Sequence, residues 1–102
     1  MPGSKYTIGV DYGTLSGRAV VVDISDGSEL GSAVFEYPNA VMDQVLNRTG
    51  EKLPPEWALQ DPNDYVEVLK HAFPEAVRNA GIDPSNVIGI ATDFTACTMV
   101  PV

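Results

Sequence analysis

The sequence predicts an α/β fold in which three strands, a long helix and a further strand follow one another along the chain. Two observations carry this prediction. Short apolar runs separated by turn residues fill the chain from Tyr6 to Tyr37. A segment with helical periodicity then runs from Asp61 to Gly81, ahead of one more apolar run.

The first two strands are expected at residues 6–11 and 18–24, where apolar and β-branched side chains dominate. The residues from Asp11 to Gly17 form the turn between them. Ser25-Asp26-Gly27-Ser28 has the composition of a tight turn, and residues 30–37 give a third, weaker strand. These three strands predict an antiparallel meander.

Residues 38–55 lack a clear period and include the pair Pro54-Pro55, which predicts a long excursion on the surface with a helical turn near residues 42–46. Trp57 follows this excursion. Its indole either lines a substrate site or anchors the excursion to the core, and we expect the second.

A helix is predicted from Pro62 to about Ala80. Asp61 is placed to cap its first turn, and Gly81 supplies its end. The apolar residues at helical spacing are expected to form one buried stripe. They are Tyr65, Val68, Leu69, Ala72, Phe73, Ala76 and Val77.

The apolar run at residues 87–91 is typical of a central parallel strand. The resulting order, β-β-β-α-β, is that of the opening of a ribonuclease H-like fold with a mixed sheet, in which the fourth strand lies parallel beside the first. This arrangement brings Thr92, Asp93 and Phe94 close to Asp11.

The turn of the first hairpin carries the chemistry of a phosphate site. Gly13 lets the backbone bring N–H groups close to an anion, and Thr14 and Ser16 add hydroxyl donors. Arg18 offers a planar fork that matches phosphate, and Asp11 offers a carboxylate to Mg²⁺. The set suits the phosphates of ATP, although an ordinary hairpin also uses Asp and Gly in its turn.

Three blocks resemble the FGGY carbohydrate kinases, which belong to the actin-like ATPase superfamily. The first is Gly9-Val10-Asp11-Tyr12-Gly13-Thr14-Leu15-Ser16-Gly17-Arg18, which looks like the first phosphate motif of that family. The second is Trp57-Ala58-Leu59-Gln60-Asp61-Pro62, which resembles the segment before the first long helix. The third is Ile90-Ala91-Thr92-Asp93-Phe94-Thr95-Ala96-Cys97-Thr98, which resembles the sugar-facing loop of the members that phosphorylate ribulose.

The resemblance implies an ATP- and Mg²⁺-dependent kinase that phosphorylates L-ribulose to L-ribulose 5-phosphate in pentose and arabinose catabolism. Asp11 would act on Mg²⁺, while Gly13, Thr14 and Ser16 would hold the phosphates. Arg18 would bind phosphate and stabilise charge on the transferred group.

The resemblance also assigns Thr95, Ala96 and Cys97 to the sugar pocket, where small side chains leave room for a ketopentose. Without the other motifs these three residues read as a packed strand end. In the family, the catalytic aspartate, a second phosphate motif and the adenosine pocket come later in the chain.

The length of 102 residues suits one small domain, whereas a kinase of this family needs two lobes. We therefore expect residues 1–102 to be the N-terminal part of the first kinase domain, inactive alone, within a longer chain that forms a homo-oligomer.

The net charge of −8, with scattered basic residues, argues against a nucleic-acid partner. It also weakens one alternative, a ribonuclease H-like nuclease that binds two metal ions at Asp11 and Asp93. A noncatalytic ATP-binding module is the other alternative.

The single cysteine, Cys97, excludes an intrachain disulfide and is consistent with the cytoplasm. The first apolar run is interrupted by Gly9 and Asp11, which argues against a signal peptide or a membrane span. His71 is expected to be a surface or packing residue without a metal role.

Overall fold

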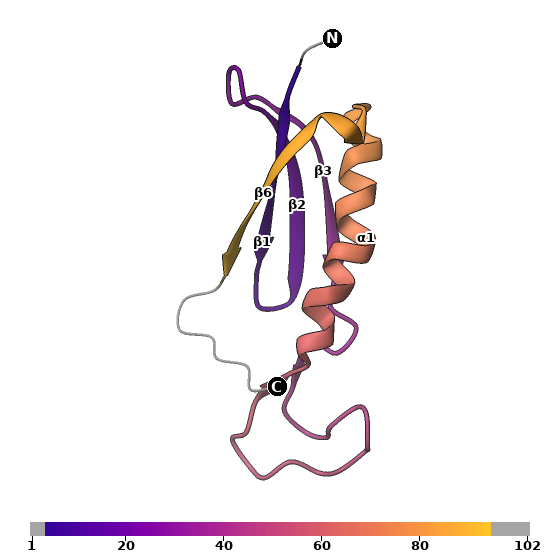
Figure 1. Ribbon diagram of the computed structural model, residues 1–102. Helices are drawn as coiled ribbons and strands as arrows, with labels where there is room; N and C mark the ends of the chain where they lie inside the picture. Colours follow the sequence, from indigo (N-terminus) through magenta and orange to yellow (C-terminus); the bar gives the residue numbers. More distant parts are fainter. Residues whose placement is uncertain (1–3, 95–102) are drawn as a thin grey trace.

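The computed structural model describes residues 4–94 as a four-stranded mixed sheet with one helix on one of its faces (Figure 1). Strands β1 (Tyr6–Tyr12), β2 (Ser16–Asp23) and β3 (Glu29–Glu36) form the antiparallel meander that the sequence predicts. Strand β6 (Val87–Phe94) lies parallel to β1 on its other side, so the sheet order is β3-β2-β1-β6. The predicted fold class and the predicted β-β-β-α-β order are confirmed.

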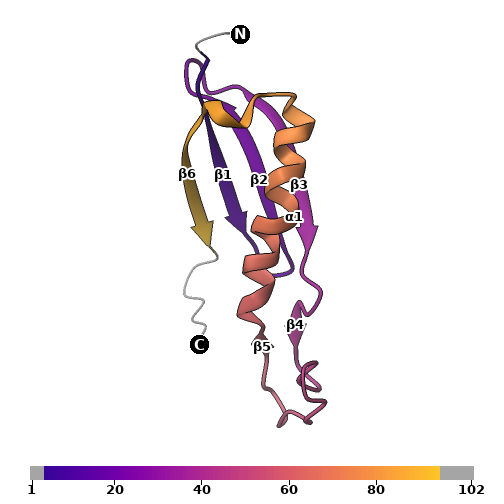
Figure 2. The same ribbon diagram turned by 45° about the vertical axis from the view of Figure 1, so that its right-hand side comes forward.

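Helix α1 spans Pro62–Ala80 and returns the chain from one end of the sheet to the other (Figure 2). Its ends are those that the sequence predicts. The side chain of Asp61 accepts a hydrogen bond from the backbone N–H of Asn63, and Gly81 closes the helix in the left-handed conformation with φ of 67°. A short 3-10 turn, Pro84–Asn86, then leads into β6.

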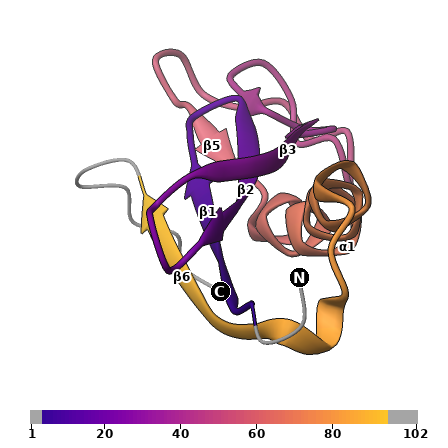
Figure 3. The same cartoon turned by 90° about the horizontal axis from the view of Figure 1, so that it is seen from above.

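The core lies between α1 and the covered face of the sheet. On that face, β1 contributes Tyr6, Ile8, Val10 and Tyr12, and β2 contributes Ala19 and Val21. The helix packs mainly on β2 and β3, as the view from above shows (Figure 3). Val68, Ala72 and Ala76 are fully buried there, and Tyr65, Phe73 and Val77 are partly buried against them.

The predicted buried stripe is wrong for one residue. Leu69 is 44% exposed, because it lies on the flank of the helix beyond the strands that α1 covers. Asp64 is instead buried, with only 3% of its surface exposed. Its carboxylate accepts hydrogen bonds from the backbone N–H of Asn39 at 3.2 Å and from Asn39 Nδ2 at 2.9 Å.

The segment between β3 and α1, which includes the predicted excursion, contains two very short strands, β4 (Val41–Met42) and β5 (Leu59–Gln60), which pair antiparallel below the main sheet (Figure 2). The predicted helical turn at residues 42–46 is wrong, because residues 41 and 42 are extended and Val45 forms a β-bridge with Lys52. Trp57 is 52% exposed, so the prediction that it anchors the excursion to the core is also wrong.

Strand β6 has β1 as its single neighbour among residues 4–94, so the segment expected as a central strand forms an edge of the described sheet. Ile88 and Ile90 of β6 are 60% and 59% exposed, because α1 lies over β2 and β3 and does not cover them. No helix in the described part of the chain is long and apolar enough to cross a membrane.

Candidate functional site

The candidate site lies at the end of the sheet where β1 and β6 both finish, beside the turn between β1 and β2 (Figure 1). The turn consists of residues 13–15, because β1 extends to Tyr12 and β2 begins at Ser16. Gly13 donates its N–H to the carbonyl of Ser16 at 2.8 Å. A Cβ at Gly13 would lie 3.1 Å from that oxygen, so the tight approach favours glycine.

The three carbonyl groups of the turn all accept hydrogen bonds from outside the hairpin. Tyr37 Oη donates to the carbonyl of Gly13 at 2.8 Å, and the backbone N–H of Tyr37 donates to the carbonyl of Leu15 at 3.0 Å. Gln60 Nε2 donates to the carbonyl of Thr14 at 3.1 Å. The carbonyls of the turn are therefore directed toward the body of the protein.

Two N–H groups of the same turn, those of Thr14 and Leu15, are directed away from the carbonyls. In a planar trans peptide the N–H points opposite to the preceding carbonyl, so anchoring the carbonyls of Gly13 and Thr14 sets the directions of the Thr14 and Leu15 N–H groups. Within residues 4–94, neither N–H donates to a backbone carbonyl, and both residues are exposed. Such N–H groups on consecutive residues form an anion-binding concavity.

The charged side chains lie on the outer face of the sheet, the face opposite α1. In the strand register, Arg18 of β2 pairs with Asp11 of β1, and Asp11 pairs with Asp93 of β6. Neighbouring strands are about 4.8 Å apart, so the three residues form one row across the sheet. The predicted proximity of the end of β6 to Asp11 is confirmed.

The guanidinium of Arg18 makes a loose contact with Glu29, at 4.0 Å. Both side chains are mostly exposed, at 51% and 67%, so this ion pair contributes little to stability. The structure thus places Arg18 in the row with Asp11, with its charged end directed at Glu29.

A shallow hollow of about 210 Å³ lies beside this row. Gly9 lines this hollow, and the space where its Cβ would lie is empty, with no atom within 4 Å. Its lining comes from three strands and consists of Gly9, Val10, Asp11, Val20, Ala91, Thr92 and Asp93. Thr95, Ala96 and Cys97, predicted for the sugar pocket, follow directly in the sequence and lie outside the described residues.

Three tyrosines and a phenylalanine form a cluster of contacting rings beside the turn. The ring of Tyr12 stacks on Phe94 at 4.7 Å and meets the edge of Tyr65 at 5.3 Å, while Tyr37 meets Tyr65 at 5.6 Å. Burial raises the pKa of Tyr12, and burial together with the neighbouring acidic groups raises the pKa of Tyr37 to about 12. Tyr37 therefore remains a hydrogen-bond donor to Gly13 throughout the neutral range.

The sequence analysis missed this aromatic cluster, together with Gln60 and Asp64. Alternation of buried and exposed positions in β1 could have placed Tyr12 on the helix side, but no pattern in the sequence indicates which residues of the excursion meet the turn.

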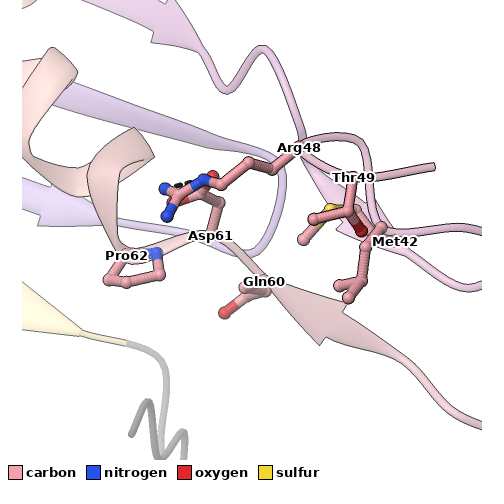
Figure 4. A pocket seen from close by; sticks show the side chains of 7 residues that line it. Met42, Arg48, Thr49, Gln60, Asp61 and Pro62 are labelled. Atoms are coloured by element: carbon pink, nitrogen blue, oxygen red, sulfur yellow. Dashed lines mark ion pairs between the residues drawn. The ribbon is translucent and has the colours of Figure 1, made fainter. Parts of the chain in front are cut away.

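A second hollow, of about 340 Å³, lies between the excursion and the start of α1 (Figure 4). Arg48 forms an ion pair with Asp61 across it at 3.6 Å. The other lining residues are Met42, Leu46, Thr49, Gln60 and Pro62. The sequence analysis assigned no role to this region.

No metal site is complete within residues 4–94, where no three His, Cys, Asp or Glu side chains gather around one point. His71 stacks on Phe35 at 4.7 Å and contacts Glu67 at 3.0 Å, so it is a packing residue. A Mg²⁺ ion bound with ATP uses one or two protein carboxylates and takes its other ligands from phosphate and water. The exposed carboxylate of Asp11 beside the turn fits that requirement.

No protein-family model matches the chain. Several individual proteins match it. A ribulokinase of Mycolicibacterium smegmatis is 58% identical over 101 residues, which cover 97% of this chain and 18% of the relative. Ribulokinases of Geobacillus thermodenitrificans and Halalkalibacterium halodurans are 53% and 58% identical, again over 18% of their length.

This similarity extends through nearly the whole chain, including the hairpin and the segment before α1. The chain spans 18% of the length of these relatives. Over this shared segment the chain is similar to proteins named ribulokinase, and this similarity supports a carbohydrate kinase family.

Proposed function

We propose that this chain is the N-terminal part of the first domain of a kinase that transfers the γ-phosphate of ATP to L-ribulose, giving L-ribulose 5-phosphate. The observation that carries the proposal is the hairpin turn, with two outward N–H groups beside Asp11 and Arg18, in a chain 58% identical to a protein named ribulokinase. We place the enzyme in the cytoplasm, with ATP and Mg²⁺ as its cofactors.

The turn binds the phosphates of ATP in this proposal. The N–H groups of Thr14 and Leu15 donate to phosphate oxygens, and the hydroxyls of Thr14 and Ser16 add two donors. Gly13 permits the close approach of the backbone. Because the turn carbonyls are already anchored, the N–H groups need little rearrangement when phosphate binds, which is what electrostatic preorganisation requires.

Asp11 holds Mg²⁺, directly or through water, and the ion would neutralise charge on the phosphate oxygens when bound. Arg18 stabilises the charge on the transferred group. Its contact with Glu29 is weak and exposed, so the guanidinium can turn to the phosphate at little cost.

Thr95, Ala96 and Cys97 face the sugar in this proposal. They follow Phe94, at the end of β6, which stacks on Tyr12 just before the turn. The described part of β6 thus ends beside the proposed phosphate site, and transfer between two bound substrates requires the sugar to lie close to the phosphates.

The test is ATP-dependent phosphorylation by the full-length protein with L-ribulose, D-ribulose, ribitol, D-xylulose and glycerol. We expect L-ribulose to be preferred. Arg18→Ala should lower kcat by about 100- to 1,000-fold, the usual loss on removing one preorganised transition-state contact. Arg78→Ala is the matched control, because Arg78 is an exposed arginine in the last turn of α1, and it should leave kcat unchanged.

Two results would contradict the proposal. Binding of ATP without phosphorylation of any of these sugars would favour a noncatalytic ATP-binding module. Mg²⁺-dependent cleavage of nucleic acid would favour a nuclease that uses the paired Asp11 and Asp93.

A further inference from the structure

We infer that Gln60 is a positioning residue for the phosphate-binding turn: its side-chain amide holds the central peptide of the turn and so sets the direction of the Leu15 N–H. This inference deepens the proposed function and rests on it for the identity of the ligand. The turn itself is residues 13–15, described above.

The amide of Gln60 is held at both of its ends. Its Nε2 donates to the carbonyl of Thr14 at 3.1 Å, and its Oε1 accepts from Tyr65 Oη at 2.6 Å. Since the carbonyl of Thr14 can only accept, the amide must present its Nε2 to the turn, and its Oε1 then accepts from Tyr65 Oη. The position of Tyr65 is fixed in turn by Tyr12 and Tyr37, whose rings it meets edge to face.

The central peptide of the turn depends on this contact more than its neighbours do. The carbonyls of Gly13 and Leu15 are both held by Tyr37, which directly follows the last residue of β3 and is therefore placed by that strand. The carbonyl of Thr14 accepts from no backbone N–H within residues 4–94, and Gln60 is its partner. Losing this bond would let the Thr14–Leu15 peptide rotate and carry the Leu15 N–H with it.

Gln60 also joins the turn to the excursion. It is the last residue of β5, pairs with Val41 of β4, and lines the hollow of about 340 Å³ beside Arg48 and Asp61. The segment that carries Gln60 is therefore placed by contacts of its own, so the side chain reaches the turn from a defined backbone position. Gln60 therefore supports the proposed phosphate site from outside the hairpin.

The test uses the full-length protein and the variant Gln60→Met, which keeps the length of the side chain, adds no charge and removes both hydrogen bonds. Gln44→Met is the matched control, because Gln44 is an exposed glutamine of the same segment between β3 and α1. Tyr65→Phe is a second variant that removes the bond orienting the amide and leaves the donor in place. Three quantities are measured: the KM for ATP with kcat, the melting temperature, and hydrogen exchange of the turn at Gly13, whose N–H is bonded to Ser16.

We expect Gln60→Met to speed exchange at Gly13 by about 3- to 10-fold, which corresponds to the loss of one hydrogen bond. The KM for ATP should rise by a similar factor, with kcat for bound substrates changed less and the melting temperature unchanged. Tyr65→Phe should show a smaller effect in the same direction, and Gln44→Met should match the wild type.

Unchanged exchange in Gln60→Met would overturn the inference, because the turn would then be held without Gln60. Faster exchange with an unaltered KM would also overturn it, because the contact would then be only structural. A wild-type protein that phosphorylates no sugar would contradict the proposed function instead, and the exchange measurement would still decide whether Gln60 holds the turn.

Discussion

Replacing Gly17 by alanine should force strand β2 away from helix α1. Gly17 lies on the covered face of the sheet, directly against Val68, which is fully buried. A Cβ built at Gly17 would lie 2.5 Å from Val68 Cγ2 and 2.7 Å from Cγ1. Its φ is outside the left-handed region, so alanine fits the backbone and the whole effect comes from this contact.

The magnitude follows from the distances. Carbon atoms in good contact are about 3.5–4.0 Å apart, so the helix and strand must separate by about 1 Å or Val68 must leave its rotamer. Overpacking of this kind costs about 1–3 kcal/mol. Because Gly17 precedes Arg18 in the hairpin, the same displacement reaches the proposed phosphate site.

A double-mutant cycle isolates the contact. Val68→Ala alone should cost about 2 kcal/mol through two lost methyl groups and the space they leave. It also removes both atoms that the new Cβ meets at less than 3 Å, leaving Val68 Cβ at 3.2 Å. The double variant should therefore be more stable than the sum of the single effects, by about 1–2 kcal/mol.

Urea unfolding of the four proteins measures this coupling, provided that the slope with urea stays constant. Gly89→Ala is the matched control, because its Cβ would meet Thr7 Oγ1 at an ordinary 3.7 Å, and its stability should stay close to that of the wild type. If the effects of Gly17→Ala and Val68→Ala add within about 0.5 kcal/mol, the packing argument is refuted.

Two further predictions concern buried polar groups. Burial raises the pKa of Tyr37 from 10 to about 12, so its contribution to stability is complete below pH 10 and is lost as the pH rises through 12. The melting-temperature difference between wild type and Tyr37→Phe should therefore be constant below pH 10 and shrink toward pH 12; a constant difference up to pH 12 would contradict the assigned shift. Asp64→Ala should cost about 1–3 kcal/mol, because two N–H groups of Asn39 lose their acceptor, and limited proteolysis should then cut residues 38–60 faster. Asp43→Ala, at an exposed position of the same excursion, should leave the cleavage rate unchanged, and equal rates in the two variants would show that Asp64 does not hold it.

Features that depend on neighbours in sequence could be predicted from the sequence. The ends of α1 are an example. Asp61 caps the first turn with its own side chain, and Gly81, which has no Cβ, adopts the left-handed conformation without strain. The hairpin is another, because alternating apolar residues and a glycine-containing turn encode it locally.

Features that depend on the position of the helix over the sheet were not predictable in the same way. Leu69 and Val68 are equally apolar, yet one is exposed and the other buried, because α1 lies over β2 and β3 rather than over β1 and β6. Asp64 carries a charged side chain, and no pattern in the sequence indicates that it is buried. It is buried because Asn39, 25 residues earlier, supplies its hydrogen bonds.

The sequence by itself determined the order of the elements, the caps of the helix and the chemical composition of the turn between β1 and β2. The reason is that backbone propensity and hydrophobic periodicity act over a few residues. Only the tertiary structure decided how that turn is held, since the donors to its carbonyls come from Tyr37 and Gln60, far along the chain. It also decided the register that places Arg18 and Asp93 directly opposite Asp11, because this row exists only once β2 and β6 have paired with β1.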